Sequence, residues 1–97
     1  MRTPDGKAPP PILMRPDEII NLKEAAHRAR RTEKVAAKLC KEFRIFRQAL
    51  PGSPLEISAP ALEMVLHADH EALSLLRIGR RDHPRVRIYF DHLGLPA

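Results

Sequence analysis

The sequence predicts a mostly α-helical domain with one small β-hairpin, and three observations support this fold class. Apolar residues fall on one helical face in four capped segments. A single strong turn, Pro51 to Pro54, separates two β-compatible stretches. At 97 residues, with 43% hydrophobic and 4% aromatic residues, the chain has room for one domain with a thin aliphatic core.

We divide the chain into three parts. Residues 1–16 begin with a proline-rich stretch and are expected to form a flexible N-terminal arm. The apolar patch Ile12 to Met14 within it either pairs as an edge strand or packs as a plug. Residues 17–66 are expected to form the folded core. Residues 67–97 are expected to form a C-terminal helical extension that packs on the core or mediates oligomerisation.

Capping residues mark the beginnings of the first two helices. Asn21, with Glu24 three residues later, matches a capping box. Thr32 is the expected N-cap of the second helix, which leaves only Arg30 to Thr32 as the connection. Two helices joined so closely indicate a helix-turn-helix. The apolar face of the first helix consists of Leu22, Ala25, Ala26 and Ala29.

The second helix carries its positive charge on one side. At about 100° per residue, Lys34, Lys38 and Lys41 cluster together with Ala37 beside them. Such a stripe is either an ordinary solvated helix face or a surface that approaches phosphates and base edges. The opposite, apolar side consists of Val35, Ala36, Leu39, Cys40 and Phe43.

A hairpin and a third helix follow. Residues 44–50 and 55–58 are the expected strands, and Ser58 or Ala59 caps the next helix, with Pro60 in its first turn. Helix, tight turn, basic helix, hairpin and helix is the order of a winged helix-turn-helix.

The C-terminal extension contains two further expected helices. The first covers residues 70–78 and ends at Gly79; Asp82 is the expected cap of the second, which ends at Gly94. The last helix shows an apolar face with Val86, Tyr89, Phe90 and Leu93. The remaining apolar residues either complete the core or form oligomer contacts, for which the candidates are Leu75, Ile78 and Ile88.

Residues 17–66 resemble the excisionase-like, MerR-type winged helix-turn-helix family. The positions that carry the resemblance are Leu22, Glu24, Ala25, Ala26, Thr32, Val35, Ile57 and Leu62. Residues 57–96 are similar to the recombination directionality factors of alphaproteobacterial integrative and conjugative elements. The chain departs from the family in its turn, where Arg30-Arg31-Thr32 replaces a glycine-containing sequence, and at Ala36, Ala37 and Leu39, where the usual arginine and tryptophan are missing.

The winged-helix arrangement implies that the second helix enters the major groove of DNA while the hairpin approaches the adjacent backbone. A net charge of +5 agrees with a polyanionic partner. Lysines dominate the stripe, so we expect log K to fall against log salt with a slope of about −4 to −6. The expected DNA-contacting residues are Lys23, Arg28, Arg30, Arg31, Thr32, Glu33, Lys34, Ala37, Lys38, Lys41, Arg44, Arg47, Gln48, Gly52 and Ser53.

Enzymatic and metal chemistry are not expected. Residues His67, Asp69 and His70 offer too few converging ligands for zinc, and Asp69 serves as a helix cap. Cys40, on an apolar face, has no histidine partner in the sequence, and Tyr89 falls on an apolar helix face. No phosphate-binding glycine loop is present, and no cofactor is expected.

The resemblance implies an excision factor that binds attachment-site DNA cooperatively and promotes integrase-mediated excision. Its expected partners are double-stranded DNA, a site-specific integrase and other copies of the same chain on the DNA. Two alternatives remain: a transcriptional regulator on the same scaffold, and a protein-interaction adaptor. The single cysteine, the absence of a signal peptide and the absence of a membrane-spanning run predict a cytoplasmic, nucleoid-associated protein.

Overall fold

The computed structural model describes residues 9–97. Residues 1–8 of the expected flexible arm lie outside this range. A short 3₁₀ helix precedes a fold of five α-helices and three short strands. In chain order the elements are η1 (Pro16–Glu18), β1 (Ile19–Ile20), α1 (Leu22–Ala29), α2 (Glu33–Phe43), β2 (Phe46–Arg47), β3 (Glu56–Ser58), α3 (Ala59–Leu66), α4 (His70–Arg77) and α5 (Pro84–Leu93). The predicted mostly helical fold with a small β-element is therefore confirmed.

Local capping explains where most helices begin. The Asn21 side chain accepts a hydrogen bond from the Glu24 N–H at 2.8 Å, and the Thr32 hydroxyl accepts one from the Val35 N–H at 3.2 Å. The expected cap of α5 was wrong, because His83 Nδ1 accepts from the Arg85 N–H at 3.1 Å. Asp82 instead lies 3.4 Å from Arg80 Nε, as part of an exposed ion pair.

The sheet contains one strand more than the hairpin. Its order is β1-β3-β2 and both pairings are antiparallel, with Ile20 opposite Ile57 and Arg47 opposite Glu56. The added edge strand, β1, comes from Ile19–Ile20 rather than from the expected patch at Ile12 to Met14.

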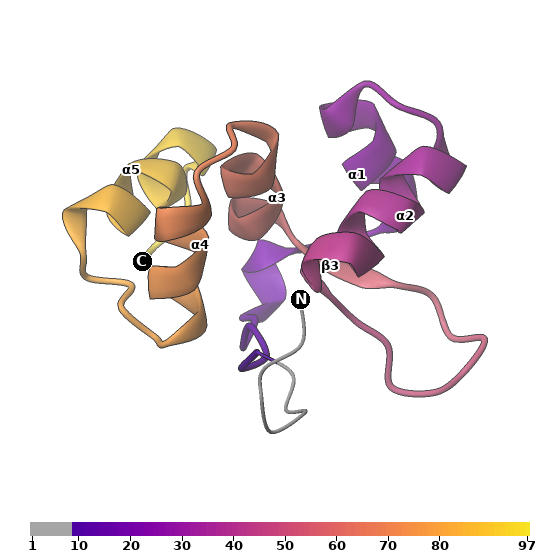
Figure 1. The fold of residues 1–97 in the computed structure, drawn as a ribbon, viewed down its shortest axis with the longest axis horizontal. Coiled ribbons are helices and arrows are strands. Elements are labelled where there is room, and N and C mark those ends of the chain that lie inside the picture. Colours follow the sequence, from indigo (N-terminus) through magenta and orange to yellow (C-terminus); the bar gives the residue numbers. More distant parts are fainter. Residues whose placement is uncertain (1–8) are drawn as a thin grey trace.

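The hairpin connection is a tight, hydrogen-bonded turn. The Ser53 N–H donates to the Leu50 carbonyl at 3.0 Å, and Gly52 has a φ of +86°, the geometry of a type II turn with Pro51 at its second position. Gln48 closes the loop by donating to the Ser53 carbonyl at 2.6 Å. The loop extends away from the helices (Figure 1).

A single hydrophobic cluster joins the two halves of the chain. Ile57 of β3, Leu62 of α3 and Phe90 of α5 are all fully buried in it. Helix α3 lies between the α1–α2 pair and the α4–α5 pair (Figure 1). The C-terminal section therefore packs on the core, which was one of its two expected roles.

Residues 9–16 lie against this body. Ile12 is only 6% exposed and belongs to the core cluster, so the apolar patch packs as a plug. Arg81, in the loop between α4 and α5, fixes this segment in place. It donates to the Leu13 carbonyl at 2.7 Å, and it forms two hydrogen bonds, of 2.7 and 3.0 Å, with the carboxylate of Glu18. Glu18 is 1% exposed and Arg81 is 18% exposed, so this largely buried ion pair joins η1 to the loop between α4 and α5.

Candidate nucleic-acid interface

Helix α2 has one buried and one exposed side. Ala36 and Cys40 are fully buried, whereas Lys34, Lys38 and Lys41 are exposed. None of these three lysines forms an ion pair with a residue from 9 to 97. We call Lys34, Ala37, Lys38 and Lys41 the lysine face; its residues line one shallow groove together with Glu42.

Val35 differs from the expectation that it faces inward, since it is 45% exposed. Helix α2 packs chiefly on α1, and this contact covers only the side of α2 that carries Ala36 and Cys40. Val35 lies beyond the edge of that contact. It lines a second concavity, at the turn between α1 and α2.

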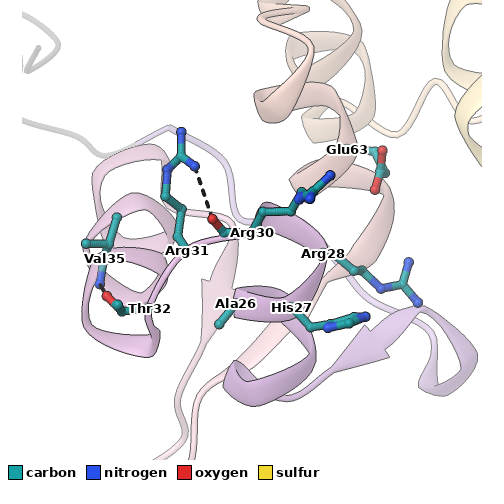
Figure 2. Close-up of a pocket in the computed structure, with 8 residues that line it drawn as sticks. All are labelled: Ala26, His27, Arg28, Arg30, Arg31, Thr32, Val35 and Glu63. Carbon is teal, nitrogen blue, oxygen red and sulfur yellow. Dashed lines mark hydrogen bonds between the residues drawn. The ribbon is translucent and has the colours of Figure 1, made fainter.

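The turn between α1 and α2 holds a non-glycine residue in the left-handed region. Arg30 has φ 58° and ψ 45°, and the following Arg31 N–H donates to the Ala26 carbonyl at 3.0 Å. For an L-residue this conformation costs roughly 1–2 kcal/mol. Both arginines are exposed, and their side chains leave the turn in different directions (Figure 2). They line an open concavity with Arg28 and Thr32.

Other residues expected near the turn are less available. Arg28 Nε lies 2.9 Å from the Glu24 carboxylate, in a pair one helical turn apart. Lys23 is exposed but sits in the first turn of α1, at the opposite end of that helix from Arg30. Glu33 is exposed in the first turn of α2.

The C-terminal end of α2 has a second left-handed arginine. Arg44 has φ 54° and ψ 47°, and the Ile45 N–H donates to the Cys40 carbonyl at 3.1 Å. Arg77 of α4 donates to the carbonyls of Phe43 and, at 3.3 Å, Arg44. These carbonyls are among those that a helix end leaves without intrahelical partners. Arg77 thus caps α2 from a distant part of the chain.

Burial, followed by the nearby charge of Arg44, lowers the pKa of Arg77. The His70 ring, at the start of α4, also stacks on Phe43, with 5.6 Å between ring centroids. Helix α4 therefore supports the end of α2 at two points.

The hairpin residues are held in the sheet and its turn. Arg47 Nε lies 2.7 Å from Glu56 across the strand pair, and Gln48 is bonded to the Ser53 carbonyl. Gly52 and Ser53 form the tip. The structure thus places these residues on one projecting hairpin, with Arg47 partly neutralised by its partner.

The cysteine and the polar residues near α4 are engaged in structural contacts. Burial raises the pKa of Cys40 to about 11, so the thiol is protonated at neutral pH. Asp69 caps α4 and accepts hydrogen bonds from Tyr89, at 2.8 Å, and Arg85, at 3.0 Å. His67 lies against the Glu63 carbonyl. Among the described residues, no three potential ligands converge on a metal position.

The three expected oligomer-contact residues fall into two classes. Leu75 is half-buried against the core, which removes it from the available surface. Ile78 and Ile88 remain 65% and 58% exposed. Ile88 lies on the face of α5 opposite the buried Val86 and Phe90.

Sequence reasoning missed the contacts of Arg77 and of the Glu18–Arg81 pair. Arg77 lies 33 residues from Arg44, and Arg81 lies 63 residues from Glu18. No local pattern links residues at such separations, so a single sequence carries no signal for either contact.

No family model, curated protein or solved structure matches this chain. Its helices between residues 9 and 97 are all too short or too polar to span a bilayer.

Proposed function

We propose that the protein binds double-stranded DNA through the lysine face of α2. The observation that carries this proposal is the contrast across the helix: Ala36 and Cys40 are buried on one side, while three lysines on the other side face solvent without carboxylate partners among residues 9–97. A helix about 10–12 Å across fits a major groove about 12 Å wide. Ala37, between the lysines, lets the backbone approach the base edges closely.

The neighbouring elements support a winged-helix mode of binding. The turn before α2 presents Arg30 and Arg31, and the hairpin after it projects from the body (Figure 1). In this mode the lysines contact phosphates, and Thr32 and Glu33, at the start of α2, lie where base contacts begin. The hairpin tip, Gly52 and Ser53, approaches the backbone beside the groove.

The biological role that we propose is that of an excision factor, based on the resemblance of residues 17–66 to excisionase-like proteins. Such a role is architectural and uses no catalytic group or cofactor. Bending DNA costs about 1–6 kcal/mol, so neighbouring copies of the protein must share this free-energy cost. The exposed Ile78 and Ile88 are the candidate contacts between copies, and a site-specific integrase is the further partner.

A substitution pair tests DNA binding directly. Lys34→Ala with Lys38→Ala removes two charges from the lysine face, and Arg80→Ala with Arg87→Ala removes two from the α4–α5 end. Fluorescence anisotropy with a 20-base-pair duplex at about 0.1 M salt should show roughly 60-fold weaker binding for the lysine pair, since each lost phosphate contact accounts for about eightfold. The arginine pair should change the affinity far less. Unchanged affinity in the lysine pair would favour the adaptor alternative.

Genomic context and footprinting separate the excision factor from a transcriptional regulator. An integrase gene and an attachment site beside the coding sequence support excision, whereas a regulated promoter alone supports the regulator. On attachment-site DNA, an excision factor that assembles along the duplex gives repeated, evenly spaced protection. A single protected site overlapping a promoter would contradict the excision role.

A further inference from the structure

We propose that α2 binds DNA phosphates at both of its ends, with Arg30 at one end and a second phosphate-binding subsite, formed by Lys41, Arg44 and Arg77, at the other. This inference rests on the proposed function, because it assumes that α2 lies in the major groove. It adds a site and a residue, Arg77, that no sequence pattern indicates.

The first line of evidence is the way the five helices end. In each, one residue adopts the left-handed conformation, and the next N–H donates to the carbonyl five residues earlier, at 2.8 to 3.1 Å. Helices α4 and α5 use Gly79 and Gly94 at this position, which glycine occupies without strain. Helix α3 uses Ala68, whereas helices α1 and α2 use Arg30 and Arg44. A strained position that holds a long cationic side chain at both ends of the lysine face indicates a function for that side chain.

The second line of evidence is the convergence of positive charge at the end of α2. Lys41 comes from α2, Arg44 follows it, and Arg77 comes from α4. None of the three forms an ion pair with a described carboxylate. Together they line an open concavity whose remaining residues are apolar: Pro9, Pro11 and Phe46.

The nearby charge of Arg44 contributes to the lowered pKa of Arg77, after burial, so the like charges of the two guanidinium groups interact. A phosphate bound beside Arg44 would reduce this repulsion and accept hydrogen bonds from Lys41 and Arg44. Arg77 already donates to the Phe43 and Arg44 carbonyls, and therefore acts chiefly by holding the Arg44 backbone in place. Lys41 and Arg44 supply the contacting donors.

The length of α2 is compatible with phosphate contacts at both of its ends. Its 11 residues span about 16 Å, whereas the major groove is about 12 Å wide. A helix inclined within the groove therefore brings its two ends towards the two bordering backbones, with Arg30 near one and Arg44 near the other. The lysine face lies between these two points.

Glycine substitutions test the subsite without breaking the fold. Arg44→Gly removes the charge and relaxes the left-handed backbone, Arg30→Gly does the same at the other end, and Ala68→Gly is the matched uncharged control at a φ of 55°. Affinity for a 20-base-pair duplex is measured by anisotropy between 0.05 and 0.3 M salt (about 0.8 of a decade), and thermal melting checks the fold. Arg44→Gly and Arg30→Gly should each make the slope of log K against log salt shallower by about 0.9 and weaken binding about eightfold at 0.1 M salt. Together they should weaken it about 60-fold, while Ala68→Gly leaves both quantities unchanged.

The outcomes separate the two proposals. If Arg44→Gly keeps the wild-type slope while Lys34→Ala with Lys38→Ala makes it shallower, the second subsite is wrong and DNA binding through α2 stands. If neither changes the slope, DNA binding through α2 is itself wrong. A weaker affinity for Arg44→Gly with an unchanged slope would also overturn the subsite, because a phosphate contact must alter the salt dependence.

Discussion

Three arginines at the α4–α5 end of the molecule are paired with carboxylates, whereas most of the cations around α2 have no carboxylate partner among the described residues. Arg80 lies 3.4 Å from Asp82, Arg81 lies 2.7 Å from Glu18, and Arg85 lies 3.0 Å from Asp69. Around α2, only Arg28 and Arg47 have carboxylate partners among the described residues. Helix ends differ in the same way, with glycine at α4 and α5 and arginine at α1 and α2.

The difference separates charge that stabilises the fold from charge that remains available to a partner. A buried, doubly hydrogen-bonded pair such as Glu18–Arg81 joins distant segments, and its loss must weaken the fold. Exposed lysines contribute little to folding, so their removal must leave stability nearly unchanged.

The largest effect is expected at Arg81. Arg81→Met keeps much of the apolar stem but leaves the Glu18 carboxylate buried without its partner, so the free energy of unfolding should fall by about 3–5 kcal/mol. Urea denaturation measures this. The neighbouring Arg80→Met is the control, since its partner Asp82 is 79% exposed and the loss should stay below about 1 kcal/mol. An equal loss in the free energy of unfolding for the two variants would contradict the distinction between buried and exposed ion pairs.

Arg77 should show an intermediate effect. Arg77→Met removes the donors to the carbonyls of Phe43 and Arg44 and should lower the free energy of unfolding by about 1–2 kcal/mol. Because these carbonyls belong to the end of α2, amide hydrogen exchange should accelerate there and remain unchanged in α5. Uniform acceleration throughout the chain would contradict a specific role for Arg77 at α2.

The left-handed helix ends give opposite effects of about 1 kcal/mol. Gly79→Ala introduces strain at a φ of +83° and should destabilise the protein by about 1 kcal/mol, although its added Cβ would meet no atom within 4 Å. Ala68→Gly removes strain at a φ of 55° and should stabilise it by up to about 1 kcal/mol. Thermal melting of both variants provides the measurement. Shifts of the same sign would contradict the assignment of strain to the backbone.

The effect that appears only at high pH concerns the single tyrosine of the chain. Burial, together with its hydrogen bond to Asp69, raises the pKa of Tyr89 to about 12. A raised pKa means that this contribution to stability is full below the ordinary value of about 10 and is lost as the pH rises towards 12. Ultraviolet titration of tyrosinate reports on Tyr89 alone. Asp69→Asn should lower the midpoint, and an unchanged midpoint would contradict the role of the hydrogen bond.

Local sequence rules predicted the helix boundaries because their causes lie within a few residues. Asn21, Thr32 and Ser58 cap the helices that follow them, and Gly79 and Gly94 end theirs as expected. The lysine face followed in the same way from helical periodicity. The cap of α5 was misassigned by one residue because Asp82 and His83 both offer an acceptor, and the choice depends on where the chain arrives from α4.

Contacts between distant segments could not be predicted. Whether Ile12 or Ile19 would form the edge strand depends on which of them meets β3, and Ile12 instead enters the core. The left-handed turn at Arg30 forms despite its cost, because the packing of α1 on α2 determines the path of the chain. The prediction that Val35 faces inward was wrong. Helical periodicity gives the direction in which a side chain points, but not how far the neighbouring helix extends to cover it.

The salt dependence of wild-type binding to double-stranded DNA tests the central claim most directly. If the exposed cations around α2 contact phosphates, log K must fall linearly against log salt with a slope of about −4 to −6. Binding whose affinity does not change with salt, or no binding at 0.05 M salt (roughly the most favourable condition), would contradict the account.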